Sequence, residues 1–96
     1  MPPTIELIYF DGCPNAEPAR TNLREALVAL DLTAEWQEWE QGDATAPEHA
    51  KLHGSPTILV NGRDVTGVEA GVTGAACRAG GAPSIEAIRA ALEEIV

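Results

Sequence analysis

The sequence predicts a single α/β domain, residues 1–96, with its elements in the order βαβαββα. Ninety-six residues of which 45% are hydrophobic suit one domain with a modest core. A strand-helix-strand unit at the start implies a right-handed crossover between parallel strands. Asn61-Gly62 is the strongest short signal for a hairpin, which adds antiparallel strands. We therefore expect a four-stranded mixed sheet with helices on both faces.

The first strand and helix have clear local signals. Residues 4–10, "TIELIYF", are rich in β-branched and aromatic side chains and are apolar on both faces except at Glu6. This composition predicts a central strand. A helix should run from about residue 16 to 30, with Asn15 as its N-cap and Pro18 in the first turn, where a missing N–H costs little.

The middle of the chain predicts an edge strand and a short helix. Residues 33–40, "TAEWQEWE", alternate with acidic side chains that suit an edge position. Trp36 and Trp39 should lie on opposite faces and serve in packing. Thr45 and Glu48 have the spacing of a capping box, so we expect a helix that ends near His53.

The last third predicts a hairpin and a final helix. Residues 57–60, "TILV", read as a buried strand, and residues 63–66 should return antiparallel after the Asn61-Gly62 turn. The glycine-rich stretch 67–83 predicts a loop. Ser84 then caps a helix whose apolar positions repeat at helical spacing, namely Ile85, Ile88, Leu92 and Ile95.

Charge and hydropathy exclude several classes of partner. The chain has 15 acidic against 6 basic residues, a net charge of −9. This balance argues against nucleic acid and anionic membrane, which need a basic surface. No apolar run approaches the roughly 18 residues of a membrane span, and the first residues lack the features of a signal peptide. We therefore expect a cytoplasmic protein whose two cysteines are thiols rather than a structural disulfide.

Cys13 is the first candidate for chemistry. It lies in "YFDGCPNAE", residues 9–17, between a strand end, a turn at Gly12 and the start of a helix. Free backbone N–H groups and the helix dipole favour a thiolate there, and we expect the side chain to be exposed at the rim of the sheet. Asp11 opposes this activation, because a nearby negative charge raises a thiol pKa and no Lys or Arg flanks the site. A small structural residue at a turn is the alternative interpretation.

Ala16 occupies the position where a Cys-x-x-Cys pair would have its second cysteine. A single thiolate can still attack a disulfide and form a mixed disulfide, which another thiol must release. That thiol is either external or Cys77 in the glycine-rich loop, provided the two Cα atoms come within about 4.4–6.8 Å. Cys77 is otherwise a loop thiol without a function, or a metal-coordinating partner of Cys13.

Two stretches carry a resemblance to a known superfamily. "GCPNA", residues 12–16, looks like the Cys-Pro-x-Cys site of glutaredoxins with the last cysteine replaced, and "GSPTILVNGRDV", residues 54–65, is similar to a cis-proline loop followed by a strand and hairpin. With the predicted order of elements, they resemble the thioredoxin-like superfamily over nearly the whole chain.

The resemblance implies both a fold and an activity. The Ser55-Pro56 bond should be cis, and its loop should lie beside the active cysteine. The implied function is that of a monothiol redox protein with no cofactor and no bound metal. Its partner would be a thiol or disulfide protein or a small-molecule thiol. Cys13 would be the nucleophile and Cys77 a candidate resolving thiol, with the substrate bound along Pro14, Ser55, Pro56 and Thr57.

Two other functions stay open. Cys13, Cys77 and Asp11 loosely resemble the cysteine-aspartate-cysteine set of organomercurial lyases, in which two thiolates hold mercury and Asp11 would protonate the carbon leaving group. A thioredoxin-like fold kept as a binding module without catalysis is the third hypothesis. His49 and His53 share the i, i+4 spacing of metal-chelating pairs, although a solvated helix face is the simpler interpretation. His53 would be a candidate base for the thiol if the loop after it lies near Cys13.

Overall fold

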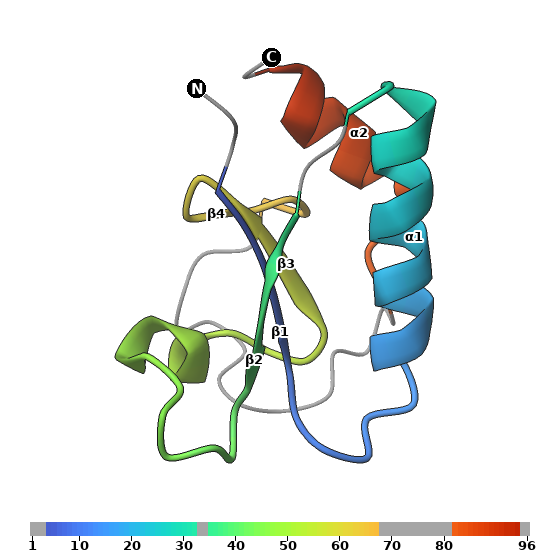
Figure 1. Cartoon of the computed structure of the whole chain (residues 1–96). Helices are drawn as coiled ribbons and strands as arrows, with labels where there is room; N and C mark the ends of the chain where they lie inside the picture. The colour runs from blue at the N-terminus through green and yellow to red at the C-terminus, as the bar shows by residue number, and fades with distance from the viewer. Residues whose placement is uncertain (1–3, 33–34, 68–81, 95–96) are drawn as a thin grey trace.

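The computed structural model describes residues 4–32, 35–67 and 82–94 (Figure 1). Cys77 and most of the predicted glycine-rich loop lie outside these ranges. In chain order the elements are β1 (Ile5–Tyr9), α1 (Ala16–Ala29), β2 (Gln37–Glu40), the 3-10 helix η1 (Glu48–Leu52), β3 (Thr57–Val60), β4 (Arg63–Asp64) and α2 (Ile85–Glu93). Among the described residues, no helix has the length and hydropathy to cross a bilayer.

The four strands form one mixed sheet in the order β2-β1-β3-β4. β1 runs parallel to β2, with Ile8 opposite Trp39. It runs antiparallel to β3, with Ile8 opposite Thr57, and β3 pairs antiparallel with β4. The predictions of a mixed four-stranded sheet, a central first strand and an edge position for the second are therefore confirmed.

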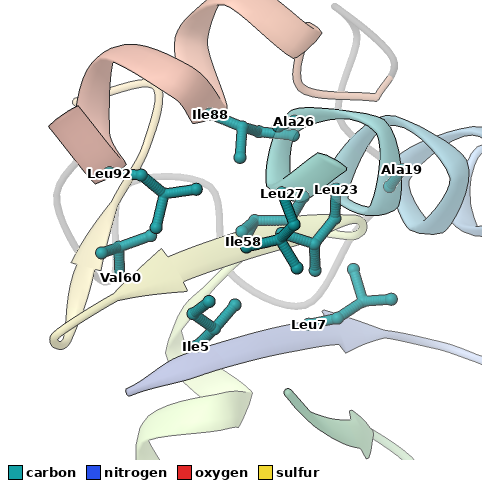
Figure 2. Close-up of a cluster of buried hydrophobic side chains, with 10 residues drawn as sticks. All are labelled: Ile5, Leu7, Ala19, Leu23, Ala26, Leu27, Ile58, Val60, Ile88 and Leu92. Carbon is teal, nitrogen blue, oxygen red and sulfur yellow. The ribbon is translucent and has the colours of Figure 1, made fainter. Parts of the chain in front are cut away.

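Both α-helices pack on one face of this sheet (Figure 2). Alternate residues of β1 and β3 point toward the helices, and each helix packs an apolar stripe at helical spacing against the sheet. Leu7, Leu23 and Ile88 are each 0% exposed in this layer. The buried cluster is Ile5, Leu7, Ala19, Leu23, Ala26, Leu27, Ile58, Val60, Ile88 and Leu92.

The second face of the sheet has a smaller core. Ile8 of β1 and Leu59 of β3 pack with Ala46 and Ala50, and Trp39 contacts the same cluster. The cover on this face comes from the segment that contains η1, which is a five-residue 3-10 helix. The structure thus has both α-helices on one face and no α-helix over residues 45–53, where the sequence predicted one.

The predicted capping box at Thr45 is wrong for a local reason. The backbone N–H and the hydroxyl of Thr45 both donate to Asp43 Oδ1, each at 2.8 Å. These bonds fold a tight turn and lower the pKa of Asp43. Pro47 is the N-cap of η1 instead, with no side-chain capping bond.

Three other local predictions are confirmed, namely the Asn61-Gly62 turn, the Ser84 cap and the N-cap position of Asn15. Asn61 and Gly62 have φ values of 52° and 83°, as a two-residue hairpin turn requires, although β4 ends at Asp64 rather than residue 66. Ser84 caps α2 by accepting from Ala87 N–H at 3.1 Å. Asn15 holds the N-cap position of α1, but its side chain makes no capping bond.

Candidate functional site

Cys13 lies in a turn that folds back on the end of β1. Its N–H donates to the carbonyl of Phe10 at 3.1 Å. Gly12 has a φ of 85°, a conformation that a residue with a Cβ adopts only at a cost. The chain then enters α1, and the N–H of Ala16 donates to the carbonyl of Cys13 at 3.3 Å. Cys13 therefore lies just before the helix, two residues ahead of the N-cap Asn15, as predicted.

The predicted exposure of Cys13 is wrong. The residue is only 7% exposed, and Ala16 beside it is 8% exposed. Its backbone bends back toward the strand end through the bond to Phe10 O, so the residue does not project from the rim as an extended chain would. Asp11 and Pro14, its near neighbours in sequence, are exposed.

The loop around Pro56 lies at the same end of β1. Ser55 Oγ accepts a hydrogen bond from Phe10 N–H at 3.1 Å, and Thr57 is opposite Ile8 in the sheet. The Ser55-Pro56 peptide is cis, as the resemblance implied. The peptide groups of one residue, Phe10, thus hold both the Cys13 turn and the Ser55-Pro56 loop. The structure brings together the two segments that the sequence singled out.

Ser55, Pro56 and Thr57 are themselves buried, each less than 2% exposed. Thr57 Oγ1 donates to Gly54 O at 2.6 Å, so the loop is fixed from within. The role of these residues in binding a substrate stays a prediction.

Gln41 supports this loop and was missed at the sequence level. Its N–H continues the β1–β2 pairing by donating to Tyr9 O at 2.7 Å. Its side chain is buried, and Nε2 donates to Ala50 O at 2.8 Å and to His53 O at 2.6 Å. No donor among the described residues reaches its Oε1. Gln41 therefore ties η1 and the residue before the Gly54 loop to the end of β2.

Carboxylates lie at the same end of the sheet. Glu40 Oε1 accepts from the N–H of Asp11 at 2.9 Å. A Cβ on residue 42 would stand 3.2 Å from both carboxyl oxygens of Glu40, so Gly42 leaves room for this group. The segment before Cys13 is thus bound to an acidic side chain, and Asp11 contributes a second, exposed one.

The interpretation of a solvated helix face is wrong for His53 and holds for the exposed His49, which also bonds to a carboxylate. His53 is 6% exposed, whereas the side chain of His49 is 47% exposed and its Nε2 lies 2.7 Å from Glu6 Oε2. No group of three or more metal-ligating side chains occurs within the described ranges. A role for His53 as a base stays a prediction, as does the pairing of Cys13 with Cys77.

Glu6 is the second residue that the sequence did not assign to a site. It lies on the central strand and is 7% exposed. Its Oε2 accepts from both Trp39 Nε1 and His49 Nε2, each at 2.7 Å. Its only signal in the sequence was a charged residue inside an otherwise apolar strand. A buried carboxylate of this kind needs such donors, because an unpartnered one would be costly.

The opposite face carries an ion pair between α1 and β2. Arg20 Nε and Nη2 donate to the two carboxyl oxygens of Glu38, both at 2.8 Å. Its Nη1 also meets Glu17, and its guanidinium lies 5.7 Å from the centre of the Tyr9 ring. The hydrogen bonds from Arg20 lower the pKa of Glu38, and those to Glu38 raise the pKa of Arg20. Arg20 is therefore engaged in structure.

No protein-family model, curated protein or solved structure matches this chain.

Proposed function

We propose that the chain is a thioredoxin-like redox protein that carries out thiol–disulfide exchange through Cys13. The observation that supports this most is the double role of Phe10. Its carbonyl accepts from Cys13 N–H and its N–H donates to Ser55 Oγ, both at 3.1 Å. The Cys13 turn and the fixed Ser55-Pro56 loop therefore meet at one strand end, where an extended disulfide substrate would contact both. The strand order β2-β1-β3-β4, with one parallel and two antiparallel pairings, supports the fold assignment.

The chemical step is nucleophilic attack by the Cys13 thiolate on one sulfur of a disulfide. A new S–S bond forms between Cys13 and that sulfur, and the other sulfur leaves as a thiolate that takes up a proton. The number of disulfide bonds is unchanged at this stage.

Release of the mixed disulfide requires a second thiol. Cys77 is the candidate within the chain, and its attack would leave an intramolecular Cys13–Cys77 disulfide and a fully reduced substrate. Two external thiols must then reduce that disulfide, and they leave joined as a new disulfide. In the alternative route, an external thiol attacks the mixed disulfide itself, which frees one of its thiols and forms a new disulfide with the other sulfur. A reducing compartment such as the cytoplasm supplies low-molecular-weight thiols for either route.

The low exposure of Cys13 bears on the class of substrate. With 7% of its surface exposed, the residue presents little of its thiol to a bulky partner. Small-molecule disulfides should therefore react faster than disulfides buried in folded proteins, unless the site opens.

The test uses Cys13→Ser and Cys77→Ser variants. We expect the Cys77→Ser protein to form one mixed disulfide with a small disulfide such as cystamine, observed by mass spectrometry. The Cys13→Ser protein should react no faster than free cysteine. An intramolecular disulfide in the wild type alone would assign Cys77 as the resolving thiol.

Two outcomes would exclude this function. Equal exchange rates in both variants would show that Cys13 has no special role. If neither variant forms a mixed disulfide with cystamine, thiol chemistry as a whole loses its basis. Tight Hg(II) binding that needs both cysteines, without exchange, would instead favour the soft-metal hypothesis.

A further inference from the structure

We propose that the contact between Glu6 and His49 is a clamp that controls access to Cys13 from the opposite face of the sheet. The clamp is defined as the 2.7 Å hydrogen bond between His49 Nε2 and Glu6 Oε2. It holds η1 on the sheet, and η1 leads directly into the loop beside the Cys13 turn. The inference rests on the proposed function only in taking Cys13 as the thiol whose access matters.

Besides the clamp, the described contacts of this segment include the packing of Ala50 and two hydrogen bonds from Gln41, and His53 at its end is buried. η1 spans five residues in a 3-10 helix, which is too short to be stable without tertiary contacts. Ala50 is 0% exposed and packs with Ile8 and Leu59, but its methyl group offers little apolar area. The carbonyls of Ala50 and His53 are held by one side chain, that of Gln41. Local opening of this segment should therefore cost less than global unfolding.

The clamp is built from one buried and one accessible partner. The Glu6 side chain is 10% exposed and the His49 side chain 47% exposed. Trp39 Nε1 donates to the same oxygen of Glu6 at 2.7 Å. When His49 moves away, Glu6 keeps one donor, and the imidazole can bond to water instead. Opening therefore does not leave the carboxylate without a partner.

Opening of η1 reaches Cys13 through three consecutive connections. His53, at the end of η1, is followed by Gly54 and the fixed loop. Ser55 of that loop accepts from Phe10 N–H at 3.1 Å. Phe10 O in turn accepts from Cys13 N–H at 3.1 Å. When the loop moves, Phe10 N–H loses its acceptor, and the backbone turn of Cys13, which is bonded to the carbonyl of the same residue, can shift with Phe10.

The experiment measures alkylation of Cys13 by iodoacetamide in a Cys77→Ser background, where Cys13 is the only thiol. His49→Ala should raise the second-order rate constant about tenfold, because a hydrogen bond to a charged group is lost from the closed form. His49→Gln keeps an N–H donor and should stay within about twofold of the parent. Glu6→Gln should give a smaller rise, about threefold, because a neutral acceptor forms a weaker bond.

Ile88→Val is the matched control. Ile88 lies in the core on the other face and is 0% exposed, so this change lowers global stability without touching the clamp. Urea unfolding of every variant gives its global stability. Under local opening, the Ile88→Val rate should stay within about twofold of the parent, whereas reaction through global unfolding would raise it in proportion to the stability lost.

The inference is overturned if His49→Ala does not raise the alkylation rate of Cys13. This includes the case in which neither the parent nor His49→Ala reacts. It is also overturned if Ile88→Val raises the rate as much as His49→Ala. If the His49→Ala protein does not fold, Glu6→Gln takes its place, and its alkylation rate must then exceed those of the parent and of Ile88→Val. Alkylation requires no disulfide, so a clamp effect without exchange activity would remove the proposed function alone, and exchange without a clamp effect would remove this inference alone.

Discussion

The ion pair between Arg20 and Glu38 should contribute a measurable and pH-dependent part of the stability. It joins α1 to the edge strand β2 through two parallel hydrogen bonds of 2.8 Å. The side chains are 20% and 30% exposed, which places the pair between a solvated surface contact and a buried one. Surface pairs contribute about 0–1 kcal/mol, and two-pronged Arg–carboxylate pairs lie at the strong end. We expect a coupling energy of about 1 kcal/mol at pH 7.

A double-mutant cycle separates the coupling energy between Arg20 and Glu38 from the other contacts of the two side chains. The variants are Arg20→Met, Glu38→Gln and the double change. Arg20 also stacks near Tyr9 and meets Glu17, and Trp36 Nε1 donates to Glu38 at 2.9 Å. Those contacts are lost equally with and without the partner, so they cancel in the cycle. Urea unfolding followed by far-ultraviolet circular dichroism gives each free energy.

The sign of the pH dependence follows from the lowered pKa of Glu38. The hydrogen bonds from Arg20 are its main cause, and they favour the charged carboxylate in the folded state. The contribution is present above the ordinary value of 4.5 and is lost as pH falls through the lower folded pKa. Arg20 stays charged throughout. A coupling energy indistinguishable from zero at pH 7, or one that persists unchanged well below the folded pKa of Glu38, would refute the argument.

Two further predictions concern turn and cap chemistry. Ser84→Ala should lower the unfolding free energy by about 1 kcal/mol, because the Ala87 N–H at the start of α2 loses its acceptor. Ser84→Asp should retain most of the wild-type unfolding free energy, because Asp is also a good N-cap. Equal losses of unfolding free energy in the two variants would contradict a capping role. Gly62→Ala should cost about 1–2 kcal/mol, because its φ of 83° is strained for a residue with a Cβ. Apart from its chain neighbours, no heavy atom lies within 4 Å of that Cβ, so crowding would not explain a loss. An unchanged free energy of unfolding in urea would contradict the strain argument.

Elements with local signals could be predicted from the sequence. The Asn61-Gly62 turn, the Ser84 cap and the apolar stripe of α1 each depend on residues close together in the chain. The Cys13 turn and the Ser55-Pro56 loop were also found, because both lie next to recognisable strand ends.

The residues that were missed depend on partners far along the chain. Glu6 meets His49, 43 residues away, and Trp39, 33 residues away. Gln41 holds carbonyls 9 and 12 residues ahead, which any polar side chain of similar length could do. The capping box failed because Asp43 competes for the N–H and hydroxyl of Thr45. Each error reflects a tertiary or competing contact that periodicity and spacing do not encode.

If Cys13 exchanges disulfides as proposed, the side chain at position 16 decides how the exchange can end. Ala16 N–H donates to Cys13 O at 3.3 Å, so the backbone already has the tight turn that places residues i and i+3 together. What is missing is only the second sulfur, and Ala16 presents a buried methyl group in its place. A mixed disulfide on Cys13 cannot be released from within this turn. Under the proposed function, the lifetime of that mixed disulfide is therefore set by the arrival of another thiol, from solution or from Cys77.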